Sequence, residues 1–131
     1  MTDEKDLIQS AITARQQAYA PYSKFKVGAA VETDDGRVFT GCNVENASYG
    51  LTICAERNAL AAAINAGARK FTRMVITSGN GVMPCGACRQ VIWELCGNIP
   101  ILLVDDNGHT AATSSERLLP NAFSPGDLDS R

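Results

Sequence analysis

The sequence predicts an α/β protein, with one mixed sheet that carries helices on both of its faces. Apolar residues recur at helical spacing near the N-terminus, and short apolar runs typical of strands alternate with helical stretches along the rest of the chain. A helix that links two strands of one sheet makes them parallel, whereas a tight hairpin makes them antiparallel. At 131 residues the chain is long enough for one hydrophobic core but not for two, so we expect a single domain over residues 1–131.

The first elements along the chain are a helix and a β-hairpin. The helix is expected over residues 3–18 and ends before Pro21. Strands are expected over 26–32 and 37–41, joined by an Asp-Asp-Gly turn. The Gly-Ala-Ala stretch at 28–30 is small for a strand. It leaves space either for a closely packed helix or for a flat ligand, and the sequence favours neither.

The rest of the chain predicts further strand–helix units. A polar loop at 42–53 precedes an alanine-rich helix at 54–66, and a second helix is expected to start with Pro84 in its first position. The remaining elements are, in order, a strand at 74–78, a buried strand at 99–104, an edge strand at 109–112, a short helix opened by a capping box of Thr113 and Glu116, and an irregular tail at 121–131.

Composition and charge exclude several classes of protein. Twelve Lys and Arg residues stand against fourteen Asp and Glu residues, and no run of basic residues offers the patch that binding to a polynucleotide needs. No apolar run approaches the roughly 18 residues of a membrane span. The acidic, polar N-terminus differs from a secretory or mitochondrial leader. We therefore expect a cytoplasmic protein that binds neither nucleic acid nor membrane.

Residues capable of chemistry concentrate in two short segments, CAE and PCGAC. In a reducing compartment, thiols at metal-binding spacing are expected to be ligands and not disulfide partners. Cys85 and Cys88 lie three positions apart and share one face of a helix, and Cys54 supplies a third thiol. Three protein ligands leave one corner of a tetrahedral zinc ion free for water, which is typical of a catalytic site. Glu56 is poorly placed to join Cys54 as a ligand and better placed to act on that water as an acid and base.

These segments resemble the metal motifs of the cytidine deaminase family. The resemblance rests on CAERNAL at 54–60 and PCGACRQ at 84–90, together with YAPYSKFKVGAA at 19–30, GCNVENA at 41–47 and LLPNAF at 118–123. It implies a three-layer α-β-α sandwich around a mixed five-stranded sheet, with one Zn²⁺ ion per chain. It also implies the hydrolytic deamination of free cytidine and deoxycytidine to uridine and deoxyuridine, with release of ammonia, as in pyrimidine salvage.

The resemblance further implies how the substrate is bound. Phe25 would stack on the pyrimidine, although composition alone favours a core position for it. Asn43 and Glu45 project to the same side of an extended chain and would hold the ribose 3′-hydroxyl; from the residues alone, a solvated or turn-capping pair is favoured. The family's short members are homotetramers with shared active sites. The other substrate-binding positions implied by the resemblance are Ala47, Tyr49, Ala55 and Phe123, the last contributed across a subunit interface.

Charge at the metal indicates a role for nearby arginines. Three thiolates and Zn²⁺ sum to −1, which weakens the ion as a Lewis acid unless other groups withdraw charge. We expect at least one of Arg57 and Arg89 to donate hydrogen bonds to cysteine sulfur. For Arg89, a solvent-exposed position is an equal alternative.

Other functions remain open at this stage. The same chemistry could act on another base, as in blasticidin deaminase or the polynucleotide deaminases. A structural zinc module would need a fourth ligand from Cys42, Cys96 or His109. A CxxC redox protein would leave Cys54 and Glu56 without a purpose.

Overall fold

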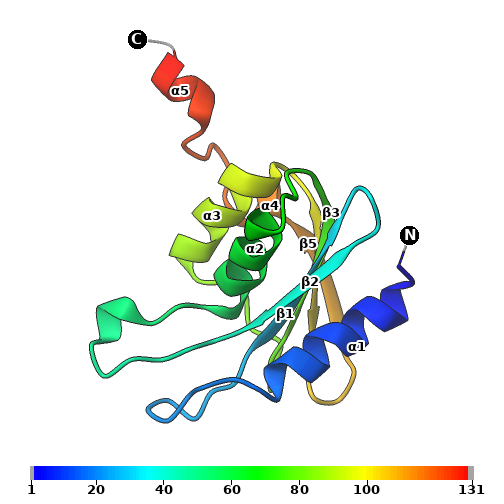
Figure 1. The fold of residues 1–131 in the computed structure, drawn as a ribbon, viewed down its shortest axis with the longest axis vertical. Helices are drawn as coiled ribbons and strands as arrows, with labels where there is room; N and C mark the ends of the chain where they lie inside the picture. The colour runs from blue at the N-terminus through cyan, green and yellow to red at the C-terminus, as the bar shows by residue number, and fades with distance from the viewer. Residues whose placement is uncertain (1, 130–131) are drawn as a thin grey trace.

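A mixed five-stranded sheet forms the centre of the computed structural model, which describes residues 2–129 (Figure 1). The strand order is β2-β1-β3-β4-β5; β3 and β4 are parallel, and all other neighbours are antiparallel. The elements are α1 (Glu4–Arg15), β1 (Gly28–Thr33), β2 (Val38–Cys42), a 3₁₀ turn η1 (Tyr49–Leu51), α2 (Ala55–Asn65), β3 (Phe71–Thr77), α3 (Gly86–Cys96), β4 (Pro100–Val104), β5 (Thr110–Ser114), α4 (Ser115–Leu118) and α5 (Pro125–Asp129). The predicted α/β class and mixed sheet are confirmed.

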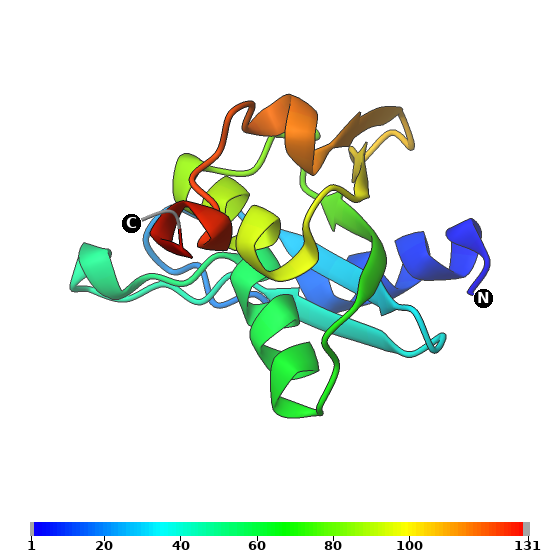
Figure 2. The ribbon, with the colours of Figure 1, turned by 90° about the horizontal axis from the view of Figure 1, so that it is seen from above.

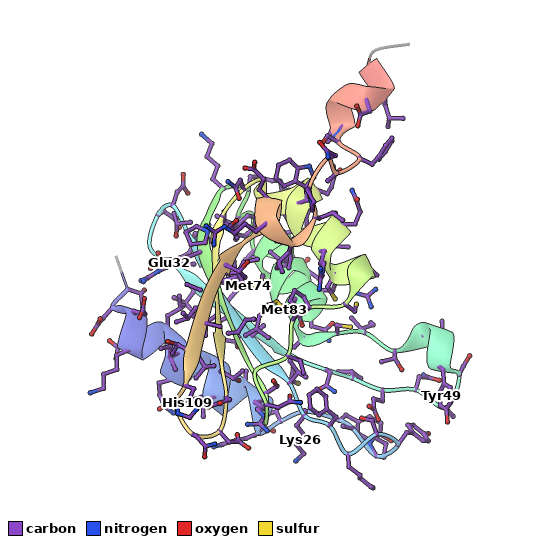
Figure 3. The ribbon with its side chains drawn as sticks, turned by 180° about the vertical axis from the view of Figure 1, so that it is seen from behind. Lys26, Glu32, Tyr49, Met74, Met83 and His109 are labelled. Atoms are coloured by element: carbon purple, nitrogen blue, oxygen red, sulfur yellow. The ribbon has the colours of Figure 1, made fainter. Side chains whose placement is uncertain are left out.

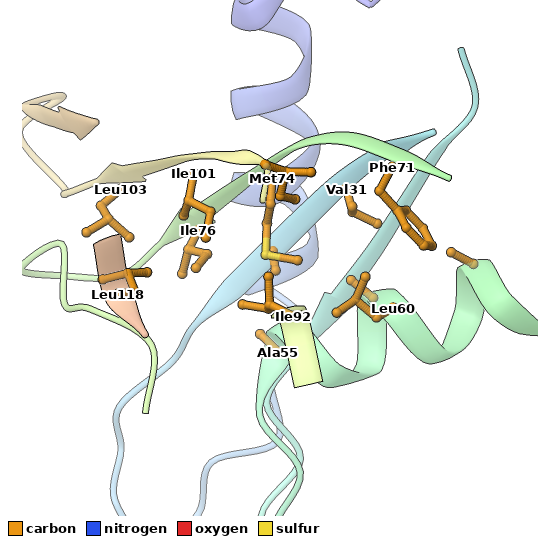
Figure 4. Close-up of a cluster of buried hydrophobic side chains, with 14 of the residues drawn as sticks. Val31, Ala55, Leu60, Phe71, Met74, Ile76, Ile92, Ile101, Leu103 and Leu118 are labelled. Atoms are coloured by element: carbon orange, nitrogen blue, oxygen red, sulfur yellow. The ribbon is translucent and has the colours of Figure 1, made fainter. Parts of the chain in front are cut away.

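Helices cover both faces of the sheet, as Figure 1 and the view from above in Figure 2 show. On one face, Leu7 and Ala11 of α1 form a small core with Ala30, Val75 and Val104 of the strands. On the other face, α2 and α3 form the larger core, in which Ile92 of α3 faces Met74 of β3 and Leu60 of α2 faces Val31 of β1 (Figure 4). The crossover from β3 through α3 to β4 gives the parallel pair that the sequence predicted.

Two glycines of the hairpin let the helices approach the sheet closely. A Cβ atom added at Gly28 would lie 2.2 Å from the carbonyl oxygen of Ala11 in α1. A Cβ atom added at Gly41 would lie 2.4 Å from the backbone nitrogen of Ala59 in α2. The small residues of the first strand therefore serve helix packing, and of the two alternatives left open for residues 28–30 the ligand space is wrong.

We expect Gly41→Ala to destabilise the protein by about 3 kcal/mol, at the upper end of the usual range for overpacking. The added methyl group would meet helix backbone, which cannot rotate away as a side chain can. Chemical denaturation of the purified proteins measures the difference. Gly50→Ala is the matched control, because a Cβ atom at Gly50 meets no atom within 4 Å. Equal stability of the two variants would contradict the close packing of α2 on β2.

The segment between α1 and β1 is longer than predicted. α1 ends at Arg15, because the chain then turns and Tyr19 forms an isolated β-bridge with Val44. The first strand begins at Gly28, two residues later than predicted. Residues 16–27 therefore run beside the loop that follows β2.

The start of α3 also differs from the prediction. Cys85 is the capping residue, and its sulfur accepts a hydrogen bond from the backbone N–H of Cys88. The helix therefore begins at Gly86, and Pro84 precedes the cap. A side chain that accepts from the first turn satisfies a backbone donor that the helix itself leaves unpaired.

The C-terminal part holds two further differences. Ser114, and not Thr113, caps α4, since its hydroxyl accepts a hydrogen bond from the backbone N–H of Arg117. The tail contains the short helix α5 where an irregular chain was expected. The side chain of Trp93 on α3 donates to Ser124 at 2.8 Å and so ties the start of this tail to the larger core layer.

Candidate metal and substrate site

Two helix N-termini bring the three predicted cysteine ligands together. Cys54 occupies the N-cap position of α2, Cys85 caps α3 through its sulfur, and Cys88 lies in the first turn of α3. The sulfur of Cys85 is 3.8 Å from that of Cys54 and 3.4 Å from that of Cys88, and all three lie within 4.8 Å of one another. The positive ends of both helix dipoles favour the thiolate forms.

The geometry of this sulfur cluster fits a zinc ion. Tetrahedral zinc with Zn–S bonds of about 2.3 Å places its sulfur ligands roughly 3.8 Å apart, close to the spacings found here. Within residues 2–129, no fourth His, Cys, Asp or Glu joins the group. Cys42 and Cys96 lie outside it, and His109 is exposed beside Asp105. The four-ligand structural module is therefore not supported.

The sulfur atoms hold their protons unequally. The pKa of Cys54 is lowered to about 5 because its sulfur accepts a hydrogen bond from the Cys88 thiol; burial opposes this effect and Arg57 adds to it. The pKa of Cys88 is raised because its thiol donates that hydrogen bond and because burial penalises its thiolate. A divalent ion that replaces these protons would bind all three sulfurs as thiolates.

Glu56 occupies the first turn of α2 and is almost completely buried, with 3% of its surface exposed. Burial raises the pKa of its carboxyl group, and the negative charge of Cys54 raises it further. A carboxyl group tuned in this direction is suited to taking up and returning protons near neutral pH. Glu56 is not part of the sulfur cluster, which agrees with its predicted role as a non-ligand.

A pocket of about 250 Å³ opens beside the cluster. Seven of the predicted site residues line it: Phe25, Asn43, Glu45, Cys54, Ala55, Glu56 and Cys85. Phe25 is 38% exposed, so the interpretation of this ring as a core residue is wrong. The pocket thus combines thiols, a buried carboxyl group and an aromatic ring.

Residues 1–102 match the family model described as the cytidine and deoxycytidylate deaminase zinc-binding region. The chain belongs to the cytidine deaminase family. The sulfur cluster of Cys54, Cys85 and Cys88 is accordingly the zinc-binding cluster of a zinc-binding deaminase, and the predicted cofactor is confirmed.

Individual cytidine deaminases match nearly the whole chain. The cytidine deaminase of Sporosarcina psychrophila is 46% identical over 129 residues, which covers 96% of this chain and 95% of that protein. The crystal structure of the cytidine deaminase from Burkholderia pseudomallei superposes with a TM-score of 0.89 at 50% identity and covers 93% of this chain and 100% of that one. The cytidine deaminase of Mycobacterium tuberculosis gives a TM-score of 0.80 at 43% identity, with 94% and 98% covered.

The two arginines expected near the metal of this cytidine deaminase family member, Arg57 and Arg89, have different partners. Nη2 of Arg57 lies 3.7 Å from the sulfur of Cys54, and its Nε is buried without a hydrogen-bond partner among residues 2–129. Arg89 instead donates to the backbone oxygen of Pro84 at 2.8 Å and to that of Leu118 at 2.9 Å. Arg57 therefore makes the expected contact with sulfur, while Arg89 is neither bonded to sulfur nor free at the surface.

We expect Arg57→Ala to lower turnover about 10- to 100-fold while zinc remains bound, because the guanidinium withdraws charge from the Cys54 sulfur without ligating the metal. Steady-state kinetics and metal analysis of the same sample measure both effects. Arg117→Ala, which removes an exposed arginine of α4, is the control. Unchanged turnover in the Arg57 variant would show that this arginine does not influence the zinc ion through the sulfur of Cys54.

Three of the predicted substrate-binding residues lie outside the pocket of their own chain. Tyr49 is 77% exposed at the end of the arm formed by the loop after β2, far from Met83 at the pocket (Figure 3). Its ring contacts that of Tyr22, with centroids 6.2 Å apart. Phe123 is 57% exposed beyond α4, and Ala47 is exposed on the same arm as Tyr49.

The pocket also contains residues that the sequence prediction missed. They are Ser23, Val27, Thr52, Ile76, Val82, Met83 and Pro84. Ser23, Val27 and Pro84 belong to segments on which the family resemblance rests, so their neighbourhood was the available signal. Ile76 and Val82 look like ordinary core and loop residues, and only the fold brings them to the site.

Proposed function

We propose that the protein catalyses the hydrolytic deamination of free cytidine and deoxycytidine to uridine and deoxyuridine, with release of ammonia, in pyrimidine salvage. Family membership supports the reaction class. The single observation that carries the proposal is the wall of the pocket, where the zinc-binding sulfurs adjoin the buried carboxyl group of Glu56. Phe25 supplies an aromatic surface on which a pyrimidine could stack.

The residues of the chain divide the work of the reaction. Zinc held by the three cysteines would supply a Lewis acid that lowers the pKa of a water molecule. Glu56 accepts one proton from the attacking water and gives it to N3 of the base as the C4–O bond forms. It then moves the proton of the new C4 hydroxyl group to the amine, so the C4–N bond breaks, ammonia leaves and the uracil ring remains. Asn43 and Glu45 hold the sugar.

The charge around the pocket favours a nucleoside over a nucleotide. The family model covers deaminases of both kinds. A 5′-phosphate needs arginine, lysine or clustered backbone N–H donors, yet no lysine or arginine is among the described residues that line the pocket. The carboxylate of Glu45 lines the pocket and would repel a phosphate.

Incubation of the purified protein with cytidine, followed by separation of the products, tests the proposal directly. We expect uridine and ammonia in equal amounts. Parallel rates on deoxycytidine, deoxycytidylate and blasticidin separate the nucleoside function from its nearest alternatives. No uridine from zinc-loaded protein, or a faster rate on deoxycytidylate or blasticidin, would overturn it.

We also propose a homotetramer in which neighbouring chains complete each other's sites. Large apolar side chains gather on the arm after β2 and on the segment beside it, and exposed patches of this kind mark interaction surfaces. The exposed residues are Tyr19, Tyr22, Val44, Tyr49, Leu51 and Ile53. Such an interface would bring Phe123, Tyr49 and Ala47 of one chain toward a neighbouring pocket. Sedimentation analysis should give the mass of four chains, and a monomer would contradict the assembly.

A cytoplasmic location is part of the proposal. None of the five cysteines, all within the described residues, forms a disulfide, as expected in a reducing compartment. No helix within the described residues has the length and apolar character to cross a membrane. Fractionation of cells that produce the protein should place it with the cytoplasmic enzymes.

A further inference from the structure

Phe25 lies in the segment between α1 and β1, outside every helix and strand. It is partly exposed. The residue before it, Lys24, has φ 62°, in the left-handed backbone region that residues other than glycine seldom adopt. A segment of this kind keeps one conformation only if its neighbours hold it. The contacts of Phe25 show which residues do so.

Asn43 holds the carbonyl side of Phe25. Its Nδ2 donates to the backbone oxygen of Phe25 at 2.8 Å, and its Oδ1 accepts from the backbone N–H of Val27 at 2.9 Å. The side-chain amide therefore makes the two hydrogen bonds that a neighbouring strand would make. Asn43 is 8% exposed, so these bonds are largely shielded from water.

Ser23 and Glu45 hold the amide side of Phe25. The backbone N–H of Phe25 donates to Oγ of Ser23 at 3.0 Å, and the same hydroxyl donates to Oε2 of Glu45. Oε1 of Glu45 accepts from the backbone N–H groups of Tyr22 at 3.0 Å and of Ser23 at 3.1 Å. The hydrogen bonds from Ser23 lower the pKa of Glu45, so its carboxylate is ionised near neutral pH and its bonds are charge-assisted.

We propose that Ser23, Glu45 and Asn43 form a clamp on both peptide groups of Phe25 and fix the aromatic wall of the pocket before substrate enters. Ser23 is a positioning residue in this arrangement, because it acts through Phe25. The inference rests on the proposed function for the identity of the base that stacks on the ring. The residues expected to hold the sugar thereby also orient the surface that binds the base.

The clamp has a consequence that sugar binding alone does not have. A ring held in place before binding need not be ordered by the substrate, so loss of the clamp weakens every ligand that stacks on Phe25. If these residues contacted only the 3′-hydroxyl, their loss would weaken the binding only of ligands that carry this group. Cytidine and a cytosine nucleoside without 2′- and 3′-hydroxyls therefore distinguish the two roles.

Ser23→Ala removes both hydrogen bonds of the hydroxyl and leaves the groups of Asn43 and Glu45 in the chain. We expect KM for cytidine to rise roughly 10-fold, which is the effect of losing the charge-assisted hydrogen bond to Glu45. We expect kcat to change much less. The Kd of the 2′,3′-dideoxy nucleoside should rise by the same factor. Ser23→Thr keeps a hydroxyl and should restore both values, and Ser10→Ala, at a serine of α1, is the matched control. Native affinity of Ser23→Ala for the dideoxy nucleoside would overturn the clamp.

Hydrogen exchange of the zinc-loaded protein without substrate tests the clamp independently of activity. In Ser23→Ala the amide of Phe25 should exchange at least about 10-fold faster than in the unmodified protein, while amides of α1 keep their rates; a hydrogen bond of this kind protects by about that factor. If the unmodified protein does not deaminate cytidine but the exchange difference is found, the proposed function fails and the clamp stands. If it deaminates cytidine and the exchange rates are equal, the clamp fails alone.

Discussion

Replacing Glu56 by Gln is expected to lower the deamination rate by about 10²–10⁴-fold or more, while the protein still binds one zinc ion per chain. The substitution keeps the shape of a side chain that is 3% exposed and removes only its ability to carry protons. The raised pKa of Glu56 means that burial already disfavours its charge, so a neutral amide should be tolerated in the fold. Uridine formation and zinc content of the same preparation measure the two effects.

The expected result separates proton transfer from metal binding. Glu56 lies outside the group of sulfur ligands, so loss of zinc from Glu56→Gln would show that the carboxyl group ligates the ion. Glu116→Gln is the control, because this exposed glutamate on α4 accepts a hydrogen bond from Asn98 and does not line the pocket. A fully active Glu56→Gln protein would remove the proposed mechanism.

Two of the three metal ligands could be predicted from the sequence because their spacing is local. Cys85 and Cys88 meet through the geometry of a single helical turn, which their spacing fixes. Cys54 comes 31 residues before Cys85, and nothing in that separation shows that the two meet. The resemblance of both segments to the metal motifs of one family supported the prediction that they meet.

Residues held by tertiary contacts could not be predicted in the same way. Residue type favours a core position for Phe25, and only the family resemblance placed it at the pocket, where Asn43, 18 positions further along the chain, donates a hydrogen bond to its backbone oxygen. The start of α3 was misplaced because proline commonly opens helices, whereas here the sulfur of Cys85 takes the capping role. In both cases a side chain takes a role that its residue type does not suggest: Phe25 lines a pocket, and Cys85 caps a helix.

The larger structural effect is expected from the metal ligands. Cys85→Ser should release zinc and destabilise the protein by several kcal/mol, because a hydroxyl is a poor zinc ligand and two thiolates hold the ion weakly. Zinc bound to structural sites is worth about 10–16 kcal/mol, comparable to the whole stability of about 5–15 kcal/mol of a typical domain. Zinc bound to the cluster would join the starts of α2 and α3, so its release from Cys85→Ser leaves two thiols and a hydroxyl group crowded between two helix N-termini.

Cys96→Ser provides the comparison, since Cys96 ends the same helix that Cys85 caps and lies outside the sulfur cluster. It should keep its zinc and lose only the packing of a partly buried thiol. Metal analysis and thermal unfolding, each with and without a chelator, should show the Cys96 variant responding to the chelator as the unmodified protein does. The Cys85 variant should already unfold at the lower temperature and respond little. Retention of one zinc ion per chain by Cys85→Ser would contradict a site in which all three sulfurs are needed to hold the metal.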